Sequence, residues 1–312
     1  MVRILILSNV FALLLTVSFA KAEILFEGYS KIISGGVHVG YIINRYEYDA
    51  KKKQFSSISF LKTNELGGNI TESLRALAGD DLKPISYSYT TLIGGAAKTI
   101  DAQFEKNKML ATVKDGEKIE KISKDLPKGT FLSTFLVYVM LKSPQGLKPD
   151  TKYEYQAIAE EDAAIQKGMA MVKTLEDVNG LKALRVLNEF KNTKFISYVS
   201  ERGEVFSTKS PVQGIATELM AQPSLATGNF GVPSSLLINL FGSVPTGVTN
   251  EVSKKAQQGP SGDVGPQEPL PGKQKGIPPS NKGILLKSGQ PKNQETAPAE
   301  SPAPTPEKKK GN

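Results

Sequence analysis

The chain of 312 residues has no cysteine, no tryptophan and one histidine, His38. Without cysteine, the chain has no disulfides and no thiol nucleophile, and it cannot be a lipoprotein anchored through a cysteine. Zinc sites built on thiolates are excluded for the same reason. A protein of this composition must rely on its hydrophobic core for stability.

The single histidine limits acid–base catalysis, because most hydrolytic sites need a base whose pKa lies near neutrality. His38 lies in the middle of an expected strand, and no serine carries the flanking glycines of a nucleophile elbow. A Ser-His-Asp triad is therefore not expected. The densest acidic cluster, Glu160-Glu161-Asp162, is the remaining candidate for carboxylate chemistry, although it lacks the spaced ligands of a calcium loop.

Two further patterns are weak. Gly67-Gly68 and Gly94-Gly95 match no phosphate-binding motif and are interpreted as turn glycines. Because tryptophan is absent, a sugar-stacking platform would rest on tyrosines such as Tyr87 and Tyr89. We therefore expect no catalytic, cofactor-binding or metal-binding residues and no cofactor.

The net charge of +8 is unevenly distributed along the chain. The first 22 residues hold two basic residues, and the stretch from Glu251 onward holds ten lysines against six acids, which leaves 27 basic and 25 acidic residues over 23–250. A nucleic-acid-binding domain concentrates its positive charge on the folded surface. We therefore expect no nucleic-acid partner.

The start of the chain has the pattern of a secretory leader. Val2-Arg3 is a short basic start, Ile4 to Ala20 is an apolar run, and Ala20-Lys21-Ala22 fits a small-x-small cleavage site. We expect a Sec-type signal peptide over residues 1–22, cleavage after Ala22, and a periplasmic or secreted mature protein without an integral membrane span. The alternative is an uncleaved anchor, which an apolar run of under about twenty residues is barely long enough to form.

From residue 23 to residue 210 the pattern is one of short β-branched and aromatic runs separated by turn residues, which predicts an antiparallel β domain. The clearest hairpin signal is Asn179-Gly180, because this dipeptide supplies the two positive φ angles of a type I′ turn. The predicted strands are Ile24–Ile33, Val37–Tyr48, Phe55–Leu61, Ile85–Ile93, Lys98–Phe104, Met109–Val113, Ala170–Val178, Leu181–Phe190, Lys194–Val199 and Val205–Thr208.

One segment has helical spacing. Thr130 is expected to cap a helix that runs through Phe131, Phe135 and Met140 and ends before Pro144. A run of about a dozen apolar residues is short for a membrane segment, which favours a helix packed on the sheet. Ile70–Ala78 is a second helix candidate, with an irregular strand as the alternative. The expected fold class is mainly β (α+β): a curved antiparallel sheet or half-barrel of hairpins with one covering helix.

The C-terminal third divides into two parts. Residues 211–250 are apolar but rich in proline and glycine, and they are expected to pack back onto the sheet, with a docking element for a partner as the alternative. Residues 251–312 are rich in proline, glycine and lysine and are expected to be a disordered tail, because such a composition buries too little apolar surface to offset the entropy of ordering.

Several short motifs carry a resemblance. They are Gly36-Val37-His38-Val39-Gly40-Tyr41, Asp80 to Tyr87, Asp101 to Phe104, and a Pro-bounded apolar helix followed by Gly146 and a strand at Tyr153. In this order the chain resembles exported bacterial proteins of an uncharacterised β-rich domain family. Those proteins are similar in outline to periplasmic lipoprotein-carrier half-barrels, in which a curved antiparallel sheet closes over helices. The resemblance implies no catalytic residues.

The leading hypothesis is a non-enzymatic periplasmic envelope protein that binds a lipid, another apolar ligand or a partner segment in a concave β-sheet. A first alternative is an envelope assembly protein that binds another envelope protein through residues 211–312. A second alternative is a carboxylate-dependent cell-wall hydrolase that uses Glu160, Glu161 and Asp162.

Overall fold

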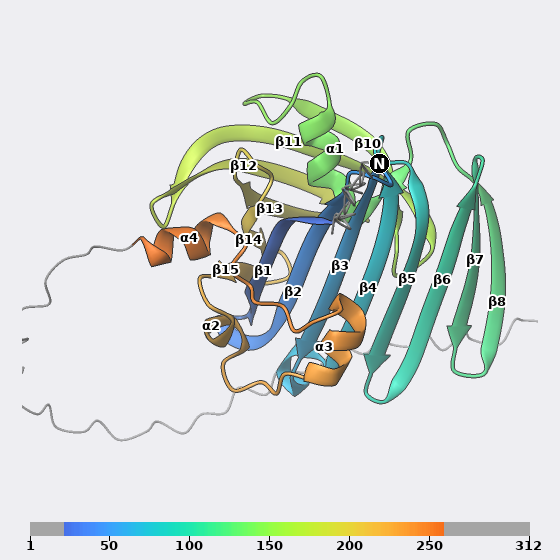
Figure 1. Ribbon diagram of the computed structural model, residues 1–312, viewed down its shortest axis with the longest axis horizontal. Coiled ribbons are helices and arrows are strands. Elements are labelled where there is room, and N and C mark those ends of the chain that lie inside the picture. The colour runs from blue at the N-terminus through green and yellow to red at the C-terminus, as the bar shows by residue number, and fades with distance from the viewer. Residues whose placement is uncertain (1–21, 259–312) are drawn as a thin grey trace, which may run out of the picture. The chain divides into compact units, whose positions relative to one another are not determined.

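A computed structural model describes residues 22–258. Over these residues the chain forms one curved sheet of 15 strands in the order β8-β7-β6-β5-β4-β3-β2-β1-β15-β14-β13-β12-β11-β10-β9 (Figure 1). The strands are β1 (Glu23–Ser34), β2 (Val37–Asp49), β3 (Gln54–Thr63), β4 (Ile70–Gly79), β5 (Pro84–Ile93), β6 (Ala96–Glu105), β7 (Lys108–Asp115), β8 (Lys118–Asp125), β9 (Phe131–Leu132), β10 (Lys152–Ala159), β11 (Ala164–Val178), β12 (Leu181–Phe190), β13 (Thr193–Val199), β14 (Val205–Ser210) and β15 (Ile215–Met220). The helical elements are η1 (Glu65–Gly67), η2 (Ser133–Phe135), α1 (Leu136–Lys142), α2 (Pro223–Thr227), α3 (Ser234–Phe241) and α4 (Glu251–Gln257).

The sheet consists of two meanders of hairpins. Strands β1 to β8 pair with their sequence neighbours, strands β10 to β15 do the same, and β1 joins the meanders by pairing with β15. At the β11–β12 turn, Asn179 and Gly180 have φ angles of 53° and 75°, as the hairpin motif predicts. The predicted mainly β fold with a curved antiparallel sheet is confirmed.

The predicted helix is correct only in its second half. Phe131 and Leu132 form the short strand β9, which pairs in parallel with Ala157 and Ile158 of β10, and α1 begins at Leu136. Both β9 side chains are buried, so the extended backbone places two consecutive apolar residues in the core and pairs its polar groups with β10. Thr130 is not the helix cap, because its hydroxyl donates to the Pro127 carbonyl oxygen at 2.8 Å.

One alternative is resolved, and two further strands were not expected. Ile70–Gly79 is strand β4, which resolves the helix-or-strand alternative in favour of the strand. The pattern did not indicate β8, whose side chains are nearly all exposed, because a strand without an apolar face has no hydrophobic periodicity. It also did not indicate β15, which lies beyond the expected domain boundary at residue 210 and pairs with both β1 and β14.

The concave side of β2 to β7 is filled by protein. Leu132, Phe135 and Ile158 pack there against small and aromatic residues of the sheet. Tyr46 donates a hydrogen bond to the Thr134 carbonyl oxygen at 3.0 Å, which ties η2 to the middle of β2. The sheet partners in this cluster are Phe55, Ala76, Ala78, Tyr87, Tyr89, Ile100, Ala102, Met109 and Ala111.

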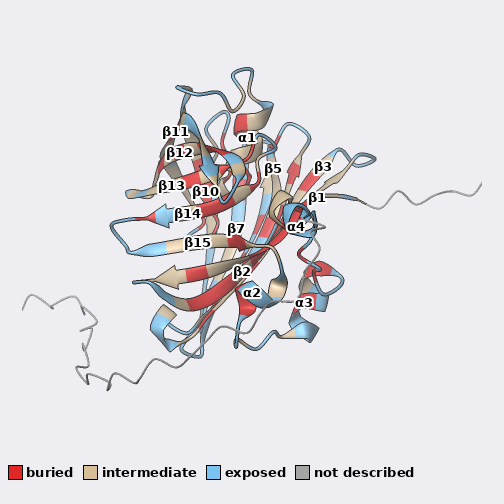
Figure 2. Cartoon of the chain, turned by 90° about the vertical axis from the view of Figure 1, so that its left-hand side faces the viewer, coloured by how far each residue is buried: buried red, intermediate tan, exposed pale blue. Residues whose placement is uncertain are grey.

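The opposite side of β1 to β3 is covered by the C-terminal extension, as Figures 1 and 2 show. Leu237 and Phe241 of α3 and Ala226 of α2 pack onto aromatic and aliphatic side chains of the first three strands. Those side chains are Tyr29, Tyr41, Ile43, Ile58 and Phe60. Of the two alternatives for residues 211–250, the structure therefore shows packing back onto the sheet.

A buried ion pair holds this extension. Arg45 Nε donates to Glu27 Oε2 at 2.6 Å, and the two side chains are 6% and 2% exposed. Arg45 Nη1 also donates to the Phe241 carbonyl oxygen at 2.8 Å, while Glu27 Oε1 accepts from the Gly247 N–H at 2.7 Å and from the Thr246 hydroxyl at 3.0 Å. Both charges are therefore hydrogen-bonded to the C-terminal extension.

The extension also fills a gap in the sheet. Strand β1 pairs with β15 only from Tyr29 onward. In the part of β1 before Tyr29, the Glu27 N–H donates instead to the Thr249 carbonyl oxygen at 3.0 Å. Asn250 then caps α4 by accepting from the Ser253 N–H at 2.8 Å. The prediction of disorder from residue 251 is thus wrong for Glu251–Gln257, because the Asn250 cap and the buried Ser253 order this turn against the sheet. The rest of the predicted tail, and the predicted leader up to Lys21, lie outside the described residues.

Candidate functional site: a groove at the edge of strand β10

The sheet has an incompletely paired strand at one end. Strand β9 pairs with β10 only at Ala157 and Ile158, although β10 begins at Lys152. Within residues 22–258, residues 152–156 of β10 therefore bond to β11 on one side and have no strand on the other.

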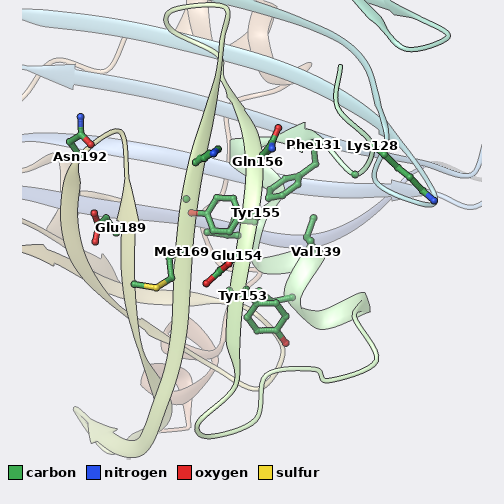
Figure 3. A pocket seen from close by; sticks show the side chains of 15 residues that line it. Lys128, Phe131, Val139, Tyr153, Glu154, Tyr155, Gln156, Met169, Glu189 and Asn192 are labelled. Carbon is green, nitrogen blue, oxygen red and sulfur yellow. The ribbon is translucent and has the colours of Figure 1, made fainter. Parts of the chain in front are cut away.

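A groove with a volume of about 830 Å³ runs along this free edge (Figure 3). It is lined by both Tyr155 and Gln156, and by both Tyr153 and Glu154. Neighbouring residues of a strand point to opposite faces of the sheet. The groove therefore wraps around the edge of β10 and has one wall on each face. We call it the β10 groove.

The first wall is apolar. It is formed by Tyr153 and Tyr155 of β10 together with Phe131 of β9 and side chains of α1, and Figure 3 shows Phe131 and Val139 on the same side of the tyrosines. Phe131 packs on Tyr155 with ring centroids 5.5 Å apart. The α1 residues in this wall are Leu136, Val139 and Met140. Leu136, Val139, Tyr153 and Tyr155 are only partly buried, so an apolar surface stays open to the groove.

Two contacts fix the tyrosines. The Tyr153 hydroxyl donates to the Gly146 carbonyl oxygen at 2.5 Å, at the end of the loop that follows α1. The Tyr155 ring lies across Gly168 of β11, where a Cβ atom would approach Tyr155 Cε2 to 2.3 Å. Burial raises the pKa of the Tyr155 hydroxyl to about 12. A side chain at position 168 would collide with the Tyr155 ring, so Gly168 is required for the ring to occupy this position.

The second wall is mainly polar. It contains Glu154, Gln156, Lys167, Glu189 and Asn192 together with the apolar Met169, and Lys128 lies at the rim beyond Phe131 (Figure 3). The two carboxylates already have cationic partners, since Glu154 pairs with Lys152 at 2.5 Å and Glu189 pairs with Lys194 at 3.8 Å. Lys128 and Lys167 are exposed, and within the described part of the chain neither has an ion-pair partner. The groove therefore presents uncompensated positive charge on its polar side.

A second, smaller cavity of about 310 Å³ lies on the concave face. It is lined by Glu160 and Glu161 from the β10–β11 turn and by Glu72 and Tyr89 from the sheet, with Ser59 on β3. Glu160 Oε2 accepts from the Ser133 hydroxyl at 2.5 Å, and its Oε1 accepts from the Thr134 N–H at 3.1 Å. We call this the acidic cavity.

Burial dominates the electrostatics of the acidic cavity. It raises the pKa of the Glu160 carboxyl to about 7, although the hydrogen bonds from Ser133 and Thr134 lower it. Burial also raises the pKa of Glu72. Near neutral pH, Glu160 therefore exists in both protonation states.

The predicted acidic cluster is divided between two environments. Glu160 points into the protein, whereas Glu161 and Asp162 both pair with Lys191 of the β12–β13 turn, at 2.6 Å for Glu161. The turn directs the Glu160 carboxylate toward η2, whereas Glu161, which also borders the acidic cavity, and Asp162 reach Lys191. Among the described residues, no group of three or more His, Asp or Glu side chains is arranged to hold a metal ion.

The other residues singled out from the sequence have structural surroundings. His38 Nε2 lies 2.9 Å from the Gly40 carbonyl oxygen, and its ring packs edge-on against Phe230. Tyr87 and Tyr89 are buried in the core of the concave side, so they offer no exposed platform for a sugar. In the part of the chain that the structure describes, no helix is both long and apolar enough to cross a membrane.

Sequence reasoning missed the β10 groove. Its available signal was the alternation in Lys152-Tyr153-Glu154-Tyr155-Gln156, which predicts a strand with one aromatic face. That alternation does not reveal that the strand lies at an edge, because strand order depends on pairing between segments far apart in the sequence.

No protein-family model and no curated protein matches this chain. Among solved structures, the chain is similar to a β-barrel-like protein of domain of unknown function DUF1849 from Brucella abortus, with 11% identity and a TM-score of 0.44, covering 62% of this chain and 94% of that one. It is also similar to a DUF1089 family protein from Pseudomonas aeruginosa, with 13% identity and a TM-score of 0.33, covering 57% of this chain and 91% of that one.

Proposed function

We propose that this protein is a non-enzymatic, exported envelope protein that binds an apolar ligand or partner segment in the β10 groove. The observation that carries the proposal is the partly exposed wall of Leu136, Val139, Tyr153 and Tyr155, backed by the buried Phe131, along a groove of about 830 Å³. Small-molecule and peptide sites have this combination of an apolar lining and a few polar groups.

The position of the groove refines the expected mode of binding. In the described residues, η2 and the β10–β11 turn pack on the concave face of β2 to β7 and leave the acidic cavity of about 310 Å³ there. The open apolar surface lies instead where α1 meets the edge of the sheet. Binding there requires no displacement of the core.

Export is supported by the sequence alone. The leader pattern of residues 1–22, with its small residues before Glu23, predicts delivery to the periplasm or the medium. A mature N-terminus at Glu23, measured by mass spectrometry of protein from the periplasmic fraction, is the expected result. Recovery of the chain in the cytosol with Met1 attached would contradict export.

The test of binding uses N-phenyl-1-naphthylamine, a neutral apolar dye whose fluorescence rises in apolar sites. We expect the full chain to bind the dye and Val139→Asp to weaken binding at least tenfold, because a carboxylate in the apolar wall must be desolvated by the ligand. Leu66→Asp is the matched control, since Leu66 is 73% exposed and lies outside the groove. Equal binding by Val139→Asp and the wild type would exclude the groove as the apolar site.

A carboxylate-dependent hydrolase is a second candidate function, and the raised pKa of Glu160 in the acidic cavity favours it. Glu160→Gln and Glu72→Gln would then each abolish release of reducing sugar or peptide from cell-wall material. Retained turnover in both variants, or no turnover in the wild type, would remove this candidate.

A third candidate is partner binding through residues 211–312. Ala226, Leu237 and Phe241 are engaged in packing on the sheet, whereas Leu225, Leu236 and Ile238 stay exposed on the extension. Loss of a cellular partner on truncation after Gln258, with the fold retained, is the result that would support it.

A further inference from the structure

Along the free edge of β10, the hydrogen bonds to β11 determine which residues direct their backbone N–H and C=O groups away from β11. The Val172 N–H donates to the Thr151 carbonyl oxygen at 2.9 Å, and the register pairs Tyr153 with Ala170 and Tyr155 with Gly168. In an antiparallel ladder, residues that bond to the partner alternate with residues whose backbone groups point away. The N–H and C=O groups of Lys152, Glu154 and Gln156 therefore point into the β10 groove.

The two walls of the groove repeat the alternation of a β-strand. A chain laid beside β10 would direct successive side chains first to the tyrosine face and then to the face of Glu154 and Gln156. The first face is apolar, and the second is mainly polar with Met169 among its side chains. The five free residues of β10 span about 17 Å, which is the length of a typical short strand. An acyl chain would fill the apolar wall but would leave the backbone groups of β10 without partners.

The charge on the polar wall favours an added strand that carries acidic residues at its polar positions. Lys128 and Lys167 have no ion-pair partner among the described residues, whereas the nearby Glu154 and Glu189 are already paired. A strand with acidic residues at its polar positions would supply the missing carboxylates. A strand with basic residues there would add unpaired positive charge.

The other end of the sheet shows that an open edge in this protein need not accept a strand. Strand β8 carries five charged residues, three of them lysines, along an almost fully exposed surface. Such charged edges discourage pairing. The β10 edge lacks this protection, because α1 and β9 build an apolar wall next to it.

We propose that the β10 groove binds an extended peptide segment of alternating apolar and acidic residues, which joins the sheet as a strand beside β10. The proposal rests on the proposed function of the groove and names the class of its occupant. Recognition combines backbone hydrogen bonds to residues 152–156, apolar side chains against Val139 and the two tyrosines, and carboxylates facing Lys167 on the polar wall, with Lys128 at the rim.

The first test uses a synthetic peptide of sequence Glu-Val-Glu-Leu-Glu-Val-Glu with blocked ends, titrated into the full chain by calorimetry. Single N-methyl groups are then introduced at each position in turn. Methylation on the amides that face β10 should weaken binding at least tenfold, and methylation of the alternate amides should change it less than threefold. A flat profile across positions would overturn strand addition. This readout needs no protein variant and so does not depend on whether a variant folds.

The second test examines charge. Lys128→Glu with Lys167→Glu should weaken binding of the acidic peptide at least tenfold and favour a peptide in which lysine replaces glutamate. The matched control is Lys148→Glu, an exposed lysine outside the groove. A peptide of the same composition with its glutamates grouped together should bind at least tenfold more weakly than the alternating one. Equal binding of the grouped and alternating peptides would contradict the proposal.

The outcomes separate the two proposals. Dye binding that depends on Val139, without any peptide binding, retains the apolar groove and rejects the peptide as its occupant. Absence of both rejects both proposals. A concentration-dependent dimer in sedimentation, abolished by Glu154→Pro, would assign the edge to a second copy of the chain and would also overturn the peptide proposal.

Discussion

At the residue scale, the charges buried in this protein perform different tasks. Glu160 connects the β10–β11 turn to η2 through Ser133 and Thr134, and it does so without a cationic partner of its own in the described residues. Glu27 and Arg45 neutralise each other and hold the C-terminal extension. A lone buried carboxyl is expected to respond to pH, whereas a buried pair is expected to respond to the loss of one partner.

Stability should fall as pH rises because of Glu160. Its pKa in the folded protein is about 7, against an ordinary value of 4.5 for a glutamate, so the folded state holds the proton more tightly. The resulting stabilisation is complete below pH 4.5 and is lost as the pH passes through 7, which amounts to about 2 kcal/mol between pH 5.5 and 8. Urea unfolding at both pH values measures this decline.

Glu160→Gln is the comparison for that measurement. Other groups with raised pKa values, such as Glu72 and Glu204, contribute in the same direction in both proteins. The decline between pH 5.5 and 8 should therefore be about 2 kcal/mol smaller in the variant. An equal decline in the two proteins would show that Glu160 does not titrate in this range.

Glu27→Gln should destabilise the protein by about 3–5 kcal/mol, because it leaves the Arg45 charge buried without a counter-ion. The double variant Glu27→Gln with Arg45→Met should recover part of the loss. Chemical denaturation measures both. Asp125→Asn, which removes one partner of an exposed pair with Lys108, is the control and should cost less than about 1 kcal/mol. A similarly small cost at Glu27 would contradict the role given to the pair.

At the element scale, the C-terminal extension acts as a cover for the first three strands. Helices α2 and α3 place Ala226, Leu237 and Phe241 on an apolar surface that would otherwise face water. The following residues occupy the part of the β1 edge that β15 leaves open. The extension is therefore a structural part of the β domain, although its proline and glycine content resembles that of a linker.

Truncation after Met220 should consequently destabilise the sheet by several kcal/mol, at about 1.5–3 kcal/mol for each large apolar side chain that loses its cover. Loss of the cooperative transition in thermal unfolding, or recovery only as aggregate, is the expected result. Truncation after Gln258 keeps the extension and should leave the transition unchanged. Equal midpoints for the two truncated proteins would show that the cover does not stabilise the sheet.

At the scale of the whole molecule, the open sheet of 15 strands in the described residues has two ends, and their edge strands differ in charge and in the surface beside them. Strand β8 is exposed and charged, whereas β10 borders an apolar groove. Charge on an edge strand prevents association with other edges. This asymmetry restricts strand addition to one end of the sheet.

Lys121→Val with Lys124→Val should therefore cause association through β8, since it removes charge and raises β propensity at an edge. Sedimentation velocity should show dimers or larger species that the wild type does not form. Lys121→Glu with Lys124→Glu keeps the edge charged and should remain at the wild-type size. A valine variant that sediments like the wild type would argue against protection by charge.

The sequence alone determined the class of the fold and most of the hairpins, because alternation and turn residues are local properties. Asn179-Gly180 specified its turn, and the apolar alternation of β2 indicated a buried face. The sequence also predicted that residues 211–250 pack back onto the sheet. It did not indicate β8, whose exposed charges carry no period, or the extended start of the predicted helix at Phe131 and Leu132.

Only the tertiary structure decided where the candidate sites lie. The groove depends on β10 being at an edge, and the environment of Glu160 depends on its turn entering the concave side of the sheet. Both result from pairing and packing between segments that are distant in sequence, such as Glu160 with Ser133 and Glu27 with Gly247. Local periodicity predicts which face of a strand is apolar. Whether another element covers that face depends on the pairing and packing of segments that are distant in sequence.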